Sequence, residues 1–254
     1  MVDGTEPVVA SRAGLVFATV SPECTETGAD GMLRSANVRT GEMRDIEPQA
    51  EALAASPSGR YLVTRALGCN APVFILDTTT GSKHTISEWK LAADGALMPT
   101  VGLRSAAFID ETHVAVSVIR YNADGSVKGG DEVRLLDVAS EQTIETAPTR
   151  FAKSLEVNIY DAEVVDGRAV LVVTTGTRPN HVRLFDANTG EEIRTLVSTV
   201  LPFSLWSADL DASGRYLLTT TYNADNQTDK VVDRWEDGVG TRLPGLTWAA
   251  WLEG

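Results

Sequence analysis

The sequence predicts an all-β fold made of a unit that recurs about every fifty residues. The unit contains a Ser/Gly turn, an apolar strand, a loop and a second strand that ends in a Thr-Gly hairpin. Residues 56–64 (SPSGRYLVT) match residues 211–219 (DASGRYLLT), and residues 74–81 match residues 182–190. Periods of this size that carry only strands and turns are typical of propeller blades. A β-propeller of about five four-stranded blades is therefore expected.

The second and third strands of each blade are marked by apolar alternation and a closing turn. In chain order they are expected at 14–20 with 32–38, 60–65 with 73–76, 113–118 with 132–136, 169–174 with 181–185, and 215–220 with 230–235. The closing turns at residues 41, 81, 141, 190 and 238 are 40, 60, 49 and 48 residues apart. The long second interval contains extra residues at 90–102 and 122–131, and inserted loops commonly carry function.

Each blade also needs an innermost strand before the first turn. The candidates lie at 7–10, 50–55, 105–109, 160–165 and 204–210, with a sixth at 246–252. Either the last strand closes the ring by completing the first blade, or the chain is a fragment of a six- or seven-bladed propeller. We expect a five-bladed ring in one domain, residues 1–254, because ring closure removes exposed strand edges.

The composition limits the classes of partner. The formal net charge of −13 argues against binding to nucleic acid or to an anionic membrane, since both need a basic face. The chain holds no long apolar run, so direct membrane insertion is not expected, and residues 1–7 lack the features of a signal peptide. Alanine is abundant and arginine outnumbers lysine, which is typical of a GC-rich bacterial source.

The repeated segments carry a resemblance to known proteins. Residues 76–81 (LDTTTG) and 185–190 (FDANTG), each associated with a Ser-Gly-Arg-Tyr turn in the repeat, resemble bacterial WD-repeat, YVTN-type and TolB-like propellers. The Trp-Asp and Gly-His pairs of eukaryotic WD-repeats are absent from these positions. Families with this pattern mostly act as binding platforms, so the resemblance implies a recognition role without naming the partner.

The candidate binding site is the face formed by the second-to-third-strand loops and the blade-to-blade connections. Exposed aromatic and arginine side chains are favoured at binding hot spots. The candidates on this face are Trp89, Arg120, Tyr121, Asn122, Arg150, Phe151, Tyr222 and Asn223. The alternative is that these residues anchor loops on neighbouring blades.

The two cysteines bear on the cellular compartment. Cys24 and Cys69 fall in equivalent loops of consecutive blades, so an inter-blade disulfide is geometrically plausible. Such a bridge would indicate an oxidising, extracytoplasmic compartment. The alternative is two free thiols in a cytoplasmic protein.

The sequence offers little metal or cofactor chemistry. Blades three and five share the word Tyr-Asn-Ala-Asp, at residues 121–124 and 222–225, where alternating oxygen side chains resemble the start of a calcium loop. The distal glutamate is missing and Asn/Asp-Gly loops are common hairpins, so calcium is not the expected occupant. No metal site, cofactor or catalytic triad is assigned.

An enzymatic alternative rests on acids near the axis. Glu51, Asp161, Glu163 and Asp209 lie on or beside innermost strands, and five-bladed glycosidases use central carboxylates. Tryptophans 206, 235, 248 and 251 are interpreted as core residues that wedge between blades. The favoured function is a non-enzymatic scaffold that binds a protein partner, as a sensor or interaction domain of an exported or membrane-anchored bacterial protein. The runner-up is a carbohydrate-active propeller.

Overall fold

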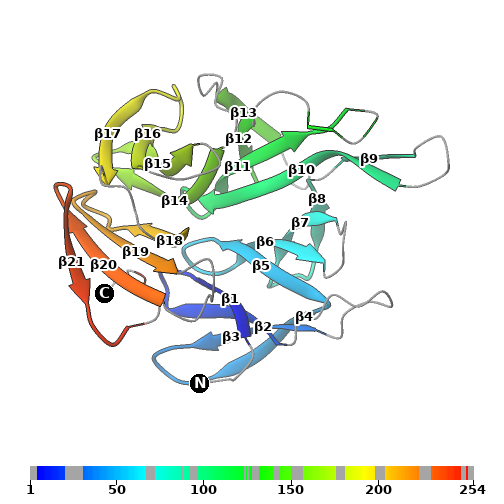
Figure 1. The fold of residues 1–254 in the computed structure, drawn as a ribbon. Coiled ribbons are helices and arrows are strands. Elements are labelled where there is room, and N and C mark those ends of the chain that lie inside the picture. Colours follow the sequence, from blue (N-terminus) through cyan, green and yellow to red (C-terminus); the bar gives the residue numbers. More distant parts are fainter. Residues whose placement is uncertain are drawn as a thin grey trace.

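Five antiparallel sheets surround a central axis in a computed structural model of the chain (Figure 1). The structure describes residues 5–20, 31–66, 72–86, 88–91, 97–122, 124, 126–127, 132–139, 144–149, 157–175, 181–197, 204–222, 230–246 and 250. Every described element is a strand or a turn, so the chain is a five-bladed β-propeller, as predicted. No helix in this described part is long and apolar enough to cross a membrane.

Each blade follows the chain from its innermost strand to its outermost strand. Blade one contains β1 (Thr5–Ala10), β2 (Leu15–Val20), β3 (Met32–Asn37) and β4 (Met43–Pro48). Blade two contains β5 (Ala50–Ala55), β6 (Tyr61–Ala66), β7 (Val73–Asp77) and β8 (Lys83–Thr85). Blade four contains β14 (Val157–Val165), β15 (Arg168–Thr175), β16 (Val182–Asp186) and β17 (Glu192–Val197). Blade five contains β18 (Ser204–Leu210), β19 (Tyr216–Tyr222), β20 (Lys230–Glu236) and β21 (Val239–Leu243).

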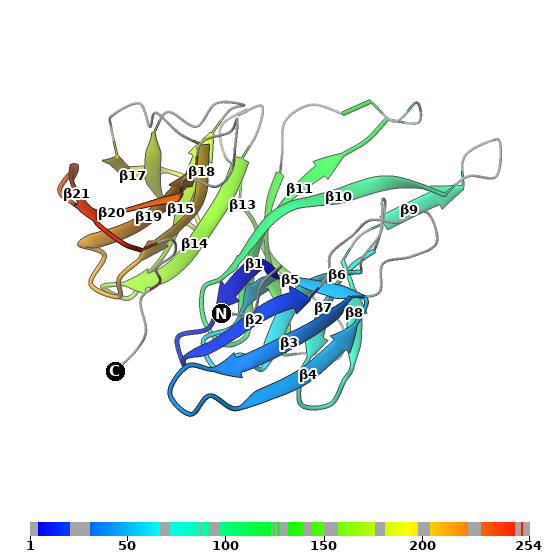
Figure 2. The same cartoon turned by 60° about the horizontal axis from the view of Figure 1, so that its bottom comes forward.

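Blade three differs from the others by one extra strand. It contains β9 (Glu88–Leu91), β10 (Leu97–Phe108), β11 (His113–Arg120), β12 (Glu132–Asp137) and β13 (Ile144–Thr149). β9 pairs only with the first half of β10, and together they extend beyond the blade as an arm (Figure 2). The first sequence insertion, residues 90–102, is therefore largely a hairpin rather than a loop.

The prediction that a sixth innermost strand closes the ring by completing blade one is wrong. β1 pairs with β2 and occupies the innermost position, so the first blade has four strands without residues 246–252. Most of that last segment lies outside the described residues. Around the axis, β1 packs on β5, β5 on β10, β10 on β14, and β14 on β18.

Apolar contacts between adjacent blades hold the ring together. Val63 and Ile75 of blade two share a buried cluster with Val114 and Val116 of blade three, and similar clusters join the later blades. A fully buried aliphatic side chain contributes about 1.5–3 kcal/mol. The core therefore lies between the blades, and the axis is left to the innermost strands.

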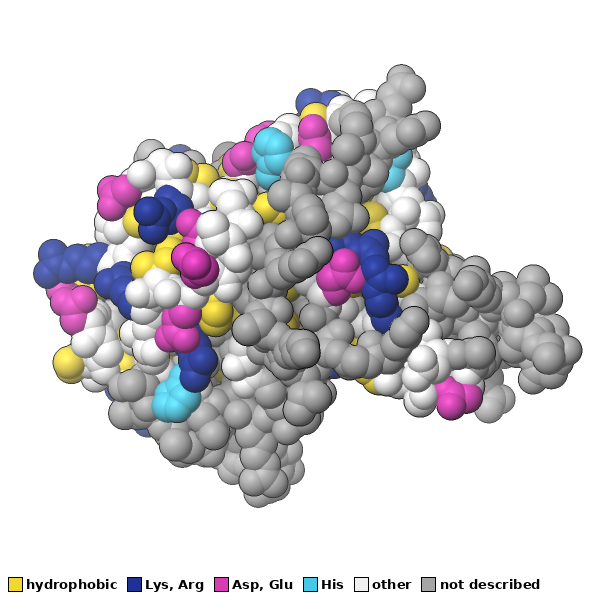
Figure 3. All heavy atoms as spheres, turned by 90° about the horizontal axis from the view of Figure 1, so that it is seen from above, with side chains coloured by type: hydrophobic (Ala, Val, Ile, Leu, Met, Phe, Trp, Pro, Cys, Tyr) yellow, Lys and Arg dark blue, Asp and Glu magenta, His cyan; other side chains and the backbone are white. Residues whose placement is uncertain are grey.

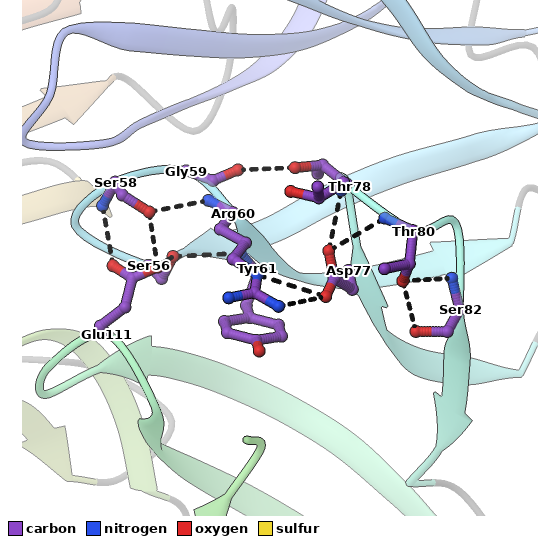
Figure 4. A network of polar contacts seen from close by, with 11 residues as sticks. Ser56, Ser58, Gly59, Arg60, Tyr61, Asp77, Thr78, Thr80, Ser82 and Glu111 are labelled. Carbon is purple, nitrogen blue, oxygen red and sulfur yellow. Dashed lines mark hydrogen bonds and ion pairs between the residues drawn. The ribbon is translucent and has the colours of Figure 1, made fainter. Parts of the chain in front are cut away.

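The repeated Ser-Gly-Arg-Tyr turns bind the blades to one another on one face, which we call the turn face. It carries the turns between first and second strands and between third and fourth strands, whereas the opposite loop face carries the remaining connections. In blade two, Arg60 donates to Asp77 at 3.0 Å, and Glu111 of blade three accepts from the Ser58 amide at 3.0 Å (Figure 4). Burial alone would raise the pKa of Asp77, but hydrogen bonds from Arg60 and two turn amides hold it below its usual value.

Two glycines explain why this turn recurs. Gly59 has a φ of +77° and Gly214 a φ of +70°, a region that only glycine adopts readily. A Cβ at residue 59 would lie 2.8 Å from a Leu15 side-chain atom, and one at residue 214 would lie 2.7 Å from Val165. Each glycine therefore serves both the turn and the close packing of the preceding blade.

Candidate functional site

The innermost strands enclose an axial channel with a cavity of about 510 Å³. All five blades contribute, and small side chains such as Ala10, Ala54 and Ala106 leave the space open. Ligand sites in proteins commonly measure about 300–1,000 Å³. The channel is large enough for a small molecule or one side chain of a partner.

Every innermost strand carries a bulge at the corresponding position. In blade two, one residue between Ala52 and Ala54 is left out of the pairing with the second strand. An equivalent shift of register occurs in each of the other four blades. In blades two to five the inserted residues are Leu53, Arg104, Tyr160 and Trp206. A bulge re-aims a side chain, and all four of these side chains line the channel. We call these four residues the belt.

The belt was missed by sequence reasoning, although the sequence contains a signal for it. In each of the four blades, the belt residue is followed by a small or polar residue and then by alanine: 53–55 is LAA, 104–106 is RSA, 160–162 is YDA and 206–208 is WSA. The alanine is the repeated part and the belt residue is the variable part. Aligning the innermost strands would have found it.

Two aromatic side chains meet where the channel approaches the loop face. Trp206 contacts Tyr222 edge to face, with ring centroids 5.3 Å apart, and the Lys230 ammonium lies 4.2 Å from the Trp206 centroid. Burial raises the pKa of Tyr160, and nearby Tyr222 adds to the effect. The interpretation of Trp206 as an inter-blade wedge is therefore wrong, because its ring lines the channel, whereas Trp235 is buried as predicted.

Two of the predicted central acids lie on the same strands as belt residues: Asp161 directly follows Tyr160, and Asp209 lies three positions beyond Trp206. Asp161 and Asp209 both line the channel. Burial raises the pKa of Asp161 well above its usual value, and the charge of Asp209 raises it further. The Leu210 amide, which donates to Asp161 at 2.7 Å, and the charge of Arg12 oppose that shift less strongly. We call these two carboxyl groups the floor.

The other two predicted acids are engaged in ion pairs. Glu163 accepts from Arg12 at 2.8 Å, which joins the first turn of blade one to blade four across the turn-face end of the axis. Glu51 is paired with Arg65 of the neighbouring strand. Neither lines the channel. Of the four acids that the sequence predicts near the axis, Asp161 and Asp209 are therefore the two that line it.

The blade-three candidates lie together at the loop-face end of β11. Arg120 donates to Glu132 at 2.8 Å, and the Asn122 amide donates to the Ser126 carbonyl at 2.7 Å. The Tyr121 ring covers Gly102, where a Cβ would lie 3.1 Å from a ring atom. Tyr121 and Tyr222 both lie at the loop-face end of a second strand, but they are not equivalent, because Tyr222 pairs with Ser204 at the position that Ile119 holds opposite Gly102.

The loop after Tyr121 uses its own oxygen side chains to form a turn. Asn122 donates to the Ser126 hydroxyl at 3.0 Å, and Asp124 accepts from the Ser126 amide at 2.9 Å. Hydrogen bonds from Ser126 lower the pKa of Asp124. Within the described residues, no group of three His, Cys, Asp or Glu side chains is arranged to hold a metal ion.

Several predicted site residues cannot be placed against the channel. Trp89 lies in β9, where its backbone pairs with that of Pro99. The remaining candidates, which are Cys24, Cys69, Arg150, Phe151 and Asn223, lie outside the described residues, as do Trp248 and Trp251. The predicted disulfide stays a prediction.

Charges on the described surface are mixed. On the side of the molecule seen in Figure 3, basic and acidic side chains are interspersed over the described atoms rather than gathered by sign. Arg183 with Glu192 and Arg215 with Glu236 are two exposed ion pairs of this kind. The channel is therefore the more distinctive feature of the described residues.

The chain is similar to several solved structures. The chain matches a Bacteroides thetaiotaomicron protein of unknown function with a TM-score of 0.50 and 11% identity, covering 94% of this chain and 57% of that one. It matches the β-propeller domain of the Trilobed protease from Pyrococcus furiosus with a TM-score of 0.48 and 12% identity, covering 94% and 71%. It matches Pyrococcus horikoshii acylaminoacyl peptidase with a TM-score of 0.49 and 13% identity, covering 95% and 39%.

These similarities concern architecture. No protein-family profile matches the chain, and no curated protein matches it. The chain spans well under two thirds of two of the three structures described, and all identities are below 15%. The chain is a β-propeller, and its resemblance to the WD-repeat, YVTN-type and TolB-like group stays a prediction.

Proposed function

We propose that this propeller is a non-enzymatic recognition domain that binds a protein partner at the loop-face end of the axial channel. The observation that carries the proposal is the belt. Equivalent bulges present four chemically different side chains, namely Leu53, Arg104, Tyr160 and Trp206, to one cavity. A purely structural position would tolerate the same residue in every blade, as the alanine two positions later does.

The chemistry of the belt suits recognition. Tryptophan, tyrosine and arginine are the residue types most often found at binding hot spots. They are held on strands rather than on loops, so the partner meets a preorganised surface. The proposed surface also includes Arg120 and Tyr121, at the loop-face end of β11, and Tyr222, which contacts Trp206.

The cellular setting belongs to the same proposal. We place the domain in an exported or membrane-anchored bacterial protein, where it acts as a sensor or interaction module. The inter-blade disulfide predicted between Cys24 and Cys69 is the sequence feature that supports this setting. The intact mass and free-thiol count of the folded, non-reduced protein test it: a monomer without free thiols supports an oxidising compartment, and two free thiols contradict it.

Peptide selection tests the recognition function. The folded protein is immobilised and panned against a phage library of random peptides, next to a Tyr121→Ala/Tyr222→Ala variant of equal thermal stability. We expect the wild type to enrich a consensus sequence that the variant does not enrich. Equal enrichment by both proteins, or no consensus for the wild type, would contradict the proposal.

A further inference from the structure

Aromatic and neutral polar side chains gather in the part of the axial channel that blades four and five form. β14 and β18 are neighbours around the axis, and both contribute to the cavity wall. Tyr160 and Trp206 occupy the same bulge position on these two strands, and Ser207 directly follows Trp206. Two residues toward the loop face, Asn158 of β14 matches the residue of β18 that pairs with Tyr222. All five of these residues are half-buried and line the cavity.

Two of the aromatic rings form a corner. The Trp206 and Tyr222 rings stand at 84° to each other, with centroids 5.3 Å apart. Burial raises the pKa of Tyr160, with a contribution from nearby Tyr222, so the Tyr160 hydroxyl stays neutral. Perpendicular rings cannot sandwich a flat aromatic ligand, which needs two parallel rings. They can contact the C–H groups of a saturated ring.

The neutral polar groups of this corner are open to a ligand. Among the described residues, the Asn158 amide, the Ser207 hydroxyl and the Trp206 indole N–H make no hydrogen bond within the protein. The amide and the hydroxyl can each donate and accept, and the indole can donate. A ligand that satisfies them must therefore both donate and accept hydrogen bonds.

The charged groups of the cavity are already engaged. Arg12 donates to Glu163 at 2.8 Å, and Asp161 accepts hydrogen bonds from two backbone amides. Arg104 and Asp209 also interact with other groups of the protein. The groups left for a ligand in this part of the wall are therefore neutral, so a charged ligand would have no dedicated partner there.

These observations define a ligand that is neutral, carries several hydroxyl groups and has an apolar ring face. We propose that the junction of blades four and five binds a neutral pyranose sugar, with ring C–H groups against Trp206 and Tyr222 and hydroxyl groups hydrogen-bonded to Asn158 and Ser207. A pyranose has hydroxyl groups around its rim, which donate and accept, and C–H groups on its faces. The inference goes beyond the proposed function, because a sugar bound at this corner needs no protein partner.

Saturation-transfer difference NMR on the folded protein tests the inference with small probes. The neutral probes are the methyl glycosides of glucose, galactose, mannose and N-acetylglucosamine, and glycerol is the control polyol that lacks a ring. We expect saturable transfer to at least one glycoside, strongest at its ring C–H protons, and none to glycerol. No saturable transfer to any of the four glycosides, or equal transfer to glycerol, would overturn the inference.

The methyl glycoside of glucuronic acid tests whether the site takes a neutral ligand. It has a carboxylate in place of the CH₂OH group of the glucoside, and this anion would enter a cavity that already holds Asp161 and Asp209. We expect the glucuronide to bind no more tightly than the glucoside. Binding of the glucuronide that is at least about tenfold tighter would show that the ligand is an anionic sugar, against the proposal.

Two variants locate the sugar. Trp206→Ala should weaken the best neutral glycoside at least about tenfold, and Asn158→Ala should weaken it about threefold to tenfold. Asn188→Ala, at the exposed turn that follows β16, is the matched control and should leave the affinity unchanged. All three are compared at equal folded fraction, measured by circular dichroism. Wild-type affinity in Trp206→Ala, or equal affinities in Asn158→Ala and Asn188→Ala, would show that the sugar does not bind at this corner.

The two proposals fail separately. Peptide selection uses displayed peptides that carry no sugar, and the NMR titration uses sugars that carry no peptide. A consensus in the panning experiment without saturable binding of any neutral glycoside would refute the sugar site and keep the recognition function. Saturable binding of a glycoside without a consensus would refute the protein-binding surface and keep the sugar site.

Discussion

The turn face carries the same contact in several blades, whereas the belt carries a different residue in each of its four blades. On the turn face, three blades repeat one contact, in which the arginine at the start of the second strand reaches the acid that ends the third strand. These pairs are Arg60 with Asp77, Arg168 with Asp186, and Arg215 with Glu236. At the belt, four equivalent positions carry leucine, arginine, tyrosine and tryptophan.

The difference separates the requirements of the fold from those of the site. Few sequences can form a turn that both caps its strands and packs on the preceding blade, so the same residues recur in several blades. A bulge re-aims its side chain into the channel whatever that side chain is, so the belt can vary without loss of the fold. Departures from an internal repeat are therefore the first place to search for function in this molecule.

The largest expected effect is at a repeated turn. Gly214→Ala should destabilise the protein by about 2–4 kcal/mol, because it adds a clash with Val165 to an unfavourable backbone conformation. Gly81→Ala is the matched control, since its φ is +75° but its Cβ would meet open space, and it should cost only about 1 kcal/mol. Urea denaturation measures both, and equal losses would show that packing between the blades does not fix the glycine.

A smaller loss is expected from the bond between blades two and three. Glu111→Ala removes the acceptor of the Ser56 hydroxyl and the Ser58 amide, and should cost about 1–2 kcal/mol. Glu192→Ala, which removes an exposed ion pair inside blade four, should cost less than about 0.5 kcal/mol. Thermal denaturation of both variants measures the difference, and similar melting temperatures would contradict the cross-blade role of Glu111.

At the floor of the channel we expect a gain of stability that depends on pH. The raised pKa of Asp161 means that the folded state holds a proton more tightly than the unfolded state, so wild-type stability falls as pH rises from about 4 toward that raised pKa. Asp209→Asn removes the neighbouring charge and should stabilise the protein at pH 7 by about 1 kcal/mol. The gain should shrink toward zero near pH 4 in denaturation measured across this range, and a constant difference would contradict the coupling.

The smallest effect is expected on the rim. Arg120→Gln breaks an exposed ion pair with Glu132, and such pairs contribute little because water screens them. Its stability should change by less than about 0.5 kcal/mol in the same urea titration. A larger loss would mean that Arg120 is a structural anchor of blade three rather than a rim residue.

The sequence predicted the fold well because strands and turns leave local signals. The segments 50–55, 204–210 and 230–235 were placed close to β5, β18 and β20, and the Thr-Gly turns marked the blades. The order of strands within each blade followed from these signals. Completion of the first blade by β1 instead of the C-terminal segment depends on long-range pairing, which local periodicity does not encode.

The candidate site was only partly predictable. Tyr222 was chosen as an exposed aromatic, and the structure joins it to Trp206, which had been interpreted as core because large apolar residues are usually buried. Arg104 was missed because a bulge, rather than strand alternation, directs it to the axis. Asp161 and Asp209 were expected near the axis, but sequence spacing could not show that Glu51 and Glu163 are held by arginines elsewhere.

The central claim is that the belt, and not the repeated turns, is the recognition site. A peptide selected by the wild type is titrated by biolayer interferometry against two double variants, Arg104→Ala/Trp206→Ala and Arg60→Ala/Arg215→Ala. The account predicts at least about a hundredfold loss of affinity for the belt variant, and wild-type affinity for the turn variant if both are folded. Retained affinity in the belt variant, with loss in the turn variant, would contradict it.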